Sequence, residues 1–328
     1  RRSFGPAYRL LGSVYRLKGD SVLTKYYRIR ANDLADYTPP LDTLVDKLAL
    51  LSKSELYLLK QIDIAERSIY PEWGLDIAIN GLKQLPDNKY LISKAIKLFF
   101  KLGHGNQAAP YLEKHISLFG DDFDEIIEIA NLLFDKGYIS QSLIYYNHAV
   151  NLSPVNPKAQ SGLALCLWDS GMQQNAISQI TDFIERNNKN PEVLTEVISF
   201  YIMVEDTEKA ILYLSQLRRI ANSNVKVKKF EGMIAEVDGK YDEAIANYES
   251  SFKADPSDLS TTRYLGNLLL KQKIWDKSIR HYKNALDYHP NEPDLLERLG
   301  TLLVSCPDIS LRDYNTAREL SERAFIHK

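Results

Sequence analysis

Residues 225–258 read VKVKKFEGMIAEVDGKYDEAIANYESSFKADPSD, and they show the pattern from which the architecture can be predicted. Gly239 separates two segments that fit helical apolar spacing, and Pro256 with its polar neighbours ends the second segment. Small residues stand at the three positions where two helices would cross closely: Gly232, Ala244 and Ser251. The stretch predicts a helical hairpin of 34 residues.

The same hairpin pattern recurs along the chain. Helix-ending prolines at Pro86, Pro154, Pro256 and Pro290 are separated by multiples of 34 residues. The small residues recur in the same phase, without an insertion, from Lys89 to Glu292, with exceptions at Phe183, Ile198 and Leu217. A fixed period of this length predicts a repeat array. The regular units are 89–122, 123–156, 157–190, 191–224, 225–258 and 259–292.

Glycine stands at the turn between the two helices of most units: Gly103, Gly137, Gly171 and Gly239. Glycine tolerates the left-handed backbone that often ends a helix. Glu205 and Lys273 replace it in two units. We therefore expect the turns at these two residues to differ slightly in shape.

These motifs resemble the tetratricopeptide repeat family. The matching residues are Tyr8, Leu11, Gly12 and Tyr15 in one unit, Ala244, Tyr248 and Pro256 in another, and Leu265, Gly266, Tyr282, Ala285 and Pro290 in a third. The resemblance implies an all-α fold, a right-handed superhelical solenoid of antiparallel helix pairs with about nine 34-residue units. It also suggests a bacterial multi-repeat protein or the repeat part of a larger protein.

Both ends of the chain depart from the regular period. We expect an N-terminal unit at 1–38, a break with a non-repeat helix at 39–54 that begins at Pro39-Pro40, and a solenoid over 55–328. The last unit, 293–328, carries an inserted loop at 306–313 in which Cys306 could be exposed. Because neither end has a polar capping helix, we expect the chain to be a fragment of a longer protein.

The sequence does not predict a catalytic or metal site. The six histidines lack metal-ligand spacing, and Cys166 has no histidine within helical reach. The glycine-rich segment 103–106 falls at a repeat turn, and the acidic run from Asp121 to Glu128 falls at a helix start, where it complements the helix dipole. We therefore expect a protein that is not an enzyme and that uses no cofactor or metal.

Charge and hydropathy give few hints about location. The 41 lysines and arginines nearly balance the 43 aspartates and glutamates, so no global field favours nucleic acid or a membrane surface. No apolar run is long enough for membrane insertion. The family resemblance favours a bacterial cell envelope or periplasm, with the cytoplasm as the alternative.

In a tetratricopeptide solenoid the first helices of the hairpins line the concave groove. The residues of these helices that point into the groove are therefore the candidate partner-binding residues. They are Asn131, Phe134, Leu165, Trp168, Met203, Lys229, Arg263, Asn267 and Lys271. Aromatic residues and methionine are typical of protein-recognition surfaces. The alternative is that Phe134, Trp168 and Met203 only pack one helix against the next. Lys229, Arg263 and Lys271 could instead hold an acidic peptide segment.

A carboxylate-gripping clamp known in this family needs asparagine where this chain has Arg298, so that kind of binding is not expected. No basic and aromatic groove for nucleic acid is apparent either. The sequence therefore predicts a non-catalytic scaffold that binds a peptide or partner protein in the concave groove. The alternatives are a regulatory or targeting region of a larger enzyme, and a structural role in a homo-oligomer through uncapped ends.

Overall fold

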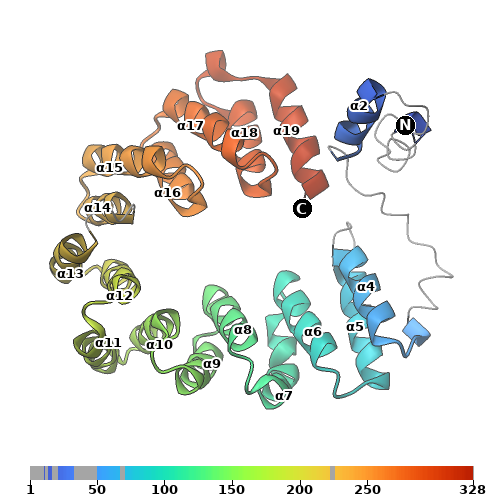
Figure 1. The fold of residues 1–328 in the computed structure, drawn as a ribbon, viewed down its shortest axis with the longest axis horizontal. Coiled ribbons are helices and arrows are strands. Elements are labelled where there is room, and N and C mark those ends of the chain that lie inside the picture. The colour runs from blue at the N-terminus through green and yellow to red at the C-terminus, as the bar shows by residue number, and fades with distance from the viewer. Residues whose placement is uncertain are drawn as a thin grey trace. The chain divides into compact units, whose positions relative to one another are not determined.

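The computed structural model describes residue 11 and residues 14–16, 21–32, 50–66, 71–221 and 226–327. Within these ranges the regular structure is helical and no residue lies in a strand (Figure 1). The predicted unit at 1–38 and the predicted break at 39–54 lie largely outside the described residues.

The chain divides into two compact units. One unit, here called the long unit, is Thr43–Ala254, and the other, the split unit, combines Arg1–Asp42 with Asp255–Lys328. The long unit contains α4 (Glu55–Glu66), α5 (Pro71–Gln84), α6 (Lys89–Lys101), η1 (Gly105–Ala108), α7 (Ala109–Phe119), α8 (Phe123–Asp135), α9 (Ile139–Leu152), α10 (Pro157–Asp169), α11 (Gln173–Asn187), α12 (Pro191–Met203), α13 (Thr207–Ile220), α14 (Lys226–Val237) and α15 (Tyr241–Ala254). The split unit contains α2 (Ser21–Asn32), α16 (Leu259–Lys271), α17 (Trp275–Tyr288), α18 (Pro293–Ser305), η2 (Ile309–Leu311) and α19 (Tyr314–His327).

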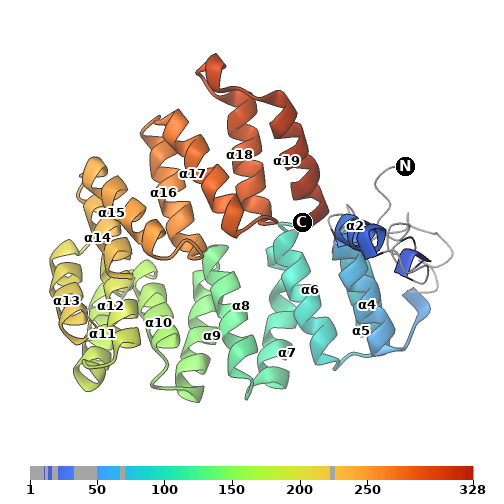
Figure 2. The ribbon, with the colours of Figure 1, turned by 45° about the horizontal axis from the view of Figure 1, so that its top comes forward.

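Consecutive helices pack as antiparallel pairs, as in α8 with α9 and α18 with α19 (Figure 2). We call the first helix of each pair an A helix and the second a B helix. In the long unit, successive A helices α6, α8, α10, α12 and α14 also contact one another, and α6 to α12 lie on the inner side of the row (Figure 1). The predicted all-α solenoid of helix pairs is confirmed, while the handedness and the domain boundaries stay predictions.

A hydrogen-bonded cap begins the A helices α6, α8, α10, α12 and α16, whereas Glu292 before α18 makes no such bond. In each capped helix a side-chain oxygen accepts a hydrogen bond from a backbone N–H two or three residues later, which satisfies a donor that the helix leaves unpaired. The capping residues are Asn88, Asp122, Asn156, Asn190 and Asp258. The 34-residue period is therefore also a period of helix starts.

The turn glycines adopt the predicted left-handed backbone, with φ from 73° to 79° at Gly103, Gly137, Gly171 and Gly239. Glu205 and Lys273 adopt it too, each with φ of 60°. The expectation of a different turn shape at these two residues is therefore wrong. The helix-ending hydrogen bonds hold the backbone there: the N–H of Asp206 donates to the carbonyl of Tyr201 at 2.9 Å, just as Tyr138 donates to Leu133 at 2.8 Å.

The inserted loop after α18 is closed by its own hydrogen bonds. The N–H of Asp313 donates to the carbonyl of Leu303 at 3.1 Å, and Nε of Arg312 donates to the carbonyl of Cys306 at 2.8 Å. Cys306 is 0% exposed. The expectation that Cys306 could be exposed is therefore wrong, because its side chain is buried.

Candidate partner-binding surface

The predicted binding residues are divided between the two units. Asn131 and Phe134 lie on α8, Leu165 and Trp168 on α10, Met203 on α12 and Lys229 on α14, all in the long unit. Arg263, Asn267 and Lys271 lie on α16 in the split unit. The two groups are therefore described separately.

In the long unit, the predicted apolar residues differ in how deeply their side chains are buried. Met203 is 56% exposed. Phe134, Leu165 and Trp168 are half-buried and pack against core residues, and the Trp168 ring meets Phe200 edge-on with 6.2 Å between the ring centroids. These three side chains thus serve helix packing and still present part of their surface.

Asn131 receives a hydrogen bond from a B helix. The hydroxyl of Tyr146 on α9 donates to Oδ1 of Asn131, and the Tyr146 ring lies against Gly162 of α10. A Cβ atom on Gly162 would lie 2.2 Å from the ring, so only glycine leaves room for this arrangement. Burial raises the pKa of Tyr146, so its hydroxyl stays a donor.

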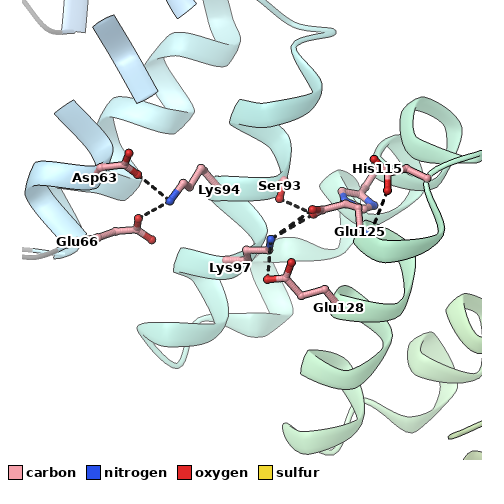
Figure 3. A network of polar contacts seen from close by, with 9 residues as sticks. Asp63, Glu66, Ser93, Lys94, Lys97, His115, Glu125 and Glu128 are labelled. Atoms are coloured by element: carbon pink, nitrogen blue, oxygen red, sulfur yellow. Dashed lines mark hydrogen bonds and ion pairs between the residues drawn. The ribbon is translucent and has the colours of Figure 1, made fainter. Parts of the chain in front are cut away.

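Charged side chains link the A helices at the start of the long unit (Figure 3). Lys94 of α6 contacts Asp63 and Glu66 of α4, with Nζ to oxygen distances of 2.8 Å and 2.6 Å. Lys97 of α6 contacts Glu128 of α8 at 2.8 Å. The sequence interpretation missed these pairs, which join α4, α6 and α8 across three successive repeats.

Glu125 is the centre of this network. Its carboxylate accepts a hydrogen bond from Oγ of Ser93 at 2.6 Å, and Nε2 of His115 lies 3.2 Å from Oε1. Burial opposes the charged form of Glu125, but the contacts with His115 and Ser93 and the charge of Lys97 lower its pKa to about 2. The helix-start interpretation is right for Asp122, which caps α8, and incomplete for Glu125.

In the split unit, internal partners already engage two predicted residues. Arg263 contacts Asp294 through Nε and Glu292 through Nη2, both at 3.0 Å. Arg298 contacts the other oxygen of Asp294 at 2.7 Å and donates to Oδ1 of Asn267, also at 2.7 Å. A partner that used Arg263 or Asn267 would have to compete with these bonds. Lys271 is exposed on α16.

Lys229 belongs to a third charged group, on the A helices at the other end of the long unit. Glu196 of α12 is half-buried, and Lys158 of α10 with Lys226 and Lys229 of α14 lie close enough to act on its carboxyl group. No hydrogen bond or ion pair to a described residue involves Glu196. Burial raises the pKa of Glu196, and the three lysines oppose that rise.

Among the residues that the structure describes, no group of three or more His, Cys, Asp or Glu side chains has the arrangement of a metal site. No helix in the described ranges combines the length and hydrophobicity of a membrane span. Cys166 is buried beside Ser142, and burial raises its pKa to about 11, which fits a packing role.

Stacked antiparallel helix pairs define an α-helical repeat protein. Residues 231–293 match the model of a family described as tetratricopeptide repeat. Residues 231–293 are therefore similar to tetratricopeptide repeats, and proteins that contain such repeats are in general scaffolds that bind proteins or peptides.

Relatives come from several kingdoms. A TPR repeat-containing protein of Methanocaldococcus jannaschii is 23% identical over 209 residues, which are 59% of this chain and 36% of that protein. Anaphase-promoting complex subunit 7 of Homo sapiens is 23% identical over 187 residues, 56% of this chain and 33% of the subunit. The chain thus spans about a third of the length of these relatives. Its expected bacterial origin and its compartment stay predictions.

A solved structure of a thermophilic TPR protein from Thermus thermophilus is also similar. It is 18% identical, covers 56% of this chain and 99% of its own, and has a TM-score of 0.43.

Proposed function

We propose that this chain is a non-catalytic scaffold that binds an extended peptide or a segment of a partner protein on the A-helix face of α8, α10, α12 and α14. This face comprises Asn131, Phe134, Leu165, Trp168, Met203 and Lys229. Arg263, Asn267 and Lys271, which the sequence also predicts as binding residues, are not part of the proposed site.

The distribution of internal bonds carries this proposal. The charged side chains on α4, α6 and α8 are joined to one another, as are those on α16 and α18. No ion pair links α10 to α12, both of which the structure describes from end to end. A partner can therefore contact the apolar side chains of Trp168 and Met203 without breaking an ion pair between these two helices.

The test starts from peptides selected on the purified chain from a phage-displayed random library. Their affinities are then measured by fluorescence polarisation for the wild type and for variants. We expect Met203→Glu and Trp168→Ala to weaken binding by roughly tenfold or more, since buried aromatic and flexible apolar contacts dominate such interfaces.

Ile144→Glu is the matched control. Ile144 is 59% exposed on the B helix α9, so the variant adds the same charge at a similarly exposed apolar residue on another face. Its affinity should stay within about twofold of the wild type. Equal losses in Met203→Glu and Ile144→Glu would rule out the assigned face.

A second proposal is that this chain is the regulatory or targeting part of a larger enzyme. One relative is named a TPR repeat-containing thioredoxin, from Arabidopsis thaliana, and is 25% identical over 114 residues that make up 16% of its length. The sequence of the whole gene product tests this proposal, which requires a catalytic signature outside these 328 residues. The predicted lack of nucleic-acid binding and the possible self-association are tested separately, by DNA titration and by light scattering.

A further inference from the structure

The last residues of four successive A helices change from acidic to apolar along the long unit. Asp135 ends α8, Asp169 ends α10, Met203 ends α12 and Val237 ends α14. All four side chains are exposed, and they occupy the same position of the repeat, 34 residues apart. Since successive A helices contact one another, these residues follow each other along the C-terminal edge of the A-helix face (Figure 1). We call these four residues the acidic–apolar edge.

The two aspartates stand where a helix disfavours them. A helix C-terminus carries partial negative charge, which basic residues stabilise and acidic residues do not. Neither aspartate forms a hydrogen bond or ion pair with any residue that the structure describes. The helices α8, α10, α12 and α14, all described from end to end, have no basic residue in their last turns. Local stability therefore does not account for Asp135 and Asp169, and residues that break a local rule are expected at functional sites.

The charges next to this edge are mainly negative. In the corners that follow the four helices, all of which the structure describes, basic residues stand only at Lys136 and Lys240. Lys240 pairs with Asp238 at 3.0 Å, so Lys136 alone offsets the two edge aspartates and the exposed Glu205. The edge therefore keeps an excess of negative charge, to which the helix ends add. Such an excess attracts a cationic ligand.

Other lysines on the A helices lie away from the acidic–apolar edge. Lys101 ends α6, one repeat before Asp135, and its Nζ donates to the carbonyl of Glu66 on α4 at 3.2 Å. Lys158 and Lys229 stand in the first turns of α10 and α14, about 12 Å or more along the helix axes from the helix ends. That separation exceeds the screening length of about 8 Å at physiological salt. These lysines therefore do not neutralise the edge.

The neighbours of the aspartates suit arginine. Phe134 and Trp168 directly precede the two aspartates, and both rings are half-buried. A guanidinium group can pair with a carboxylate and stack on an aromatic ring, which an ammonium group does less well. Further along the edge, Met203 is 56% exposed and Val237 is 41% exposed, and they offer apolar contact area. The edge thus suits two kinds of side chain in a fixed order.

We propose that the acidic–apolar edge binds an extended peptide segment with two arginines next to two apolar residues, the arginines at the two aspartates and the apolar residues at Met203 and Val237. Neighbouring helices lie about 8–10 Å apart, which corresponds to about three residues of extended chain. The four recognised residues are therefore spaced by about three along the peptide. This inference rests on the proposed function, because it assigns the partner's chemistry on the same A-helix face.

The probes are three fluorescein-labelled serine–glycine peptides, titrated by fluorescence polarisation at low ionic strength. The arginine–leucine peptide carries arginine at its first and fourth positions and leucine at its seventh and tenth. The glutamate–leucine peptide has glutamate in place of arginine, and the alternating peptide exchanges the second arginine with the first leucine. We expect the arginine–leucine peptide to bind roughly tenfold more tightly than the glutamate–leucine peptide and roughly threefold more tightly than the alternating peptide.

Variants of the edge test each half of the site. Asp135→Asn combined with Asp169→Asn should weaken the arginine–leucine peptide roughly tenfold and remove its advantage over the glutamate–leucine peptide. Val237→Ser should weaken it roughly threefold, since apolar contact area is lost. By circular dichroism, the double asparagine variant should melt no lower than the wild type, because the aspartates do not stabilise their helices.

Matched controls lie on B helices. Asp182→Asn on α11 neutralises an exposed carboxylate, and Ile211→Ser on α13 replaces an apolar residue that is 52% exposed. Each control should leave the affinity for the arginine–leucine peptide within about twofold. These variants separate the edge from general effects of charge and hydrophobicity.

The inference is overturned if the arginine–leucine peptide binds no more tightly than the glutamate–leucine peptide, if the double asparagine variant fails to weaken it, or if Asp182→Asn weakens it as much. Self-association in light scattering that Met203→Glu abolishes would also overturn it, because a second copy of the chain would then cover the edge. The proposed function fails separately, through equal losses of library-selected peptides in Met203→Glu and Ile144→Glu. Selected peptides that depend on Trp168 and bind the double asparagine variant equally well would leave that function standing without this inference.

Discussion

The ring of Tyr248 lies directly against Gly232, so that a Cβ atom on the glycine would lie 2.6 Å from Cδ1 of the tyrosine. The Tyr248 hydroxyl passes this glycine and donates to Oε2 of Glu236 at 2.9 Å. A B-helix tyrosine thereby reaches a polar group of its A helix. Gly266 and Tyr282 repeat the close approach one unit later.

Gly232→Ala should destabilise the long unit. Overpacking against a buried ring costs about 1–3 kcal/mol, which exceeds the gain of about 1 kcal/mol from replacing a helical glycine. We expect a net loss of roughly 1 kcal/mol in the free energy of unfolding, measured by urea denaturation. Gly300→Ala is the control, because its Cβ would lie 3.5 Å or more from other atoms, and it should stabilise its helix. A stabilised Gly232→Ala variant would contradict this packing argument.

Glu205→Gly and Lys273→Gly should each stabilise the protein. Both residues hold φ of 60°, which costs a residue with a side chain about 1–2 kcal/mol, while glycine loses about 0.5–1 kcal/mol in chain entropy. The expected net gain is about 0.5 kcal/mol, seen as a raised melting temperature. Gly171→Ala, at φ of 79°, should shift the temperature in the opposite direction. A lower melting temperature in the glycine variants would show that their side chains make contacts worth more than the strain.

The Glu125 network predicts a pH-dependent stability. The pKa of Glu125 falls from 4.5 to about 2 on folding, so the stabilisation is present above pH 4.5 and is lost as pH falls toward 2. The size of this effect is on the order of 3 kcal/mol. Urea denaturation of the wild type between pH 5 and 2 should show the loss.

Glu125→Gln should unfold more easily at pH 7 and lose less further stability in that acidic range. Glu113→Gln, a change at an exposed residue of α7, is the comparison. If Glu125→Gln and the wild type lost stability in parallel between pH 4.5 and 2, the network would not be the source of the acid sensitivity.

Arg263→Ala should destabilise the split unit even if Arg263 also contacts a partner. Its guanidinium joins α16 to Glu292 and Asp294, but the side chain is 43% exposed, so the expected loss is only about 1 kcal/mol. Arg280→Ala removes a pair within one helix and should cost less. Melting temperatures of the two variants give the comparison, and equal values would argue against the bridging role of Arg263.

The sequence was sufficient for the helix pairs because their signals are local. The turn glycines, such as Gly137 and Gly171, and the prolines that follow four of the B helices can be interpreted from neighbouring residues alone. Glu205 and Lys273 misled the prediction, because hydrogen bonds at the helix end hold the left-handed backbone whatever the side chain. The buried position of Cys306 depends on how a loop folds, which local spacing does not specify.

The charge pairs between repeats were missed because their partners are distant in sequence. A usable signal existed: Lys94 pairs with Glu66, and Lys97 with Glu125, both at a separation of 28 residues. A search for opposite charges near one repeat length apart would have found both pairs.

The sequence predicts which residues lie at the candidate surface, but not which of them bond to neighbouring repeats. Met203 and Trp168 follow from the repeat position alone. The engagement of Arg263 by Asp294, and of Asn267 by Arg298, depends on which rotamers neighbouring repeats allow, and only the structure shows it.

The ion pairs of Lys94 and Lys97 also have a mechanical consequence. They tie α4, α6 and α8 together at the tips of long side chains, far from the helix axes, so bending this part of the long unit would stretch bonds as well as shift packed side chains. The described side chains form no ion pair between α10 and α12, so bending there would only shift packed side chains. We therefore expect the long unit to bend more easily at α10 and α12, which carry Trp168 and Met203, than at α4, α6 and α8.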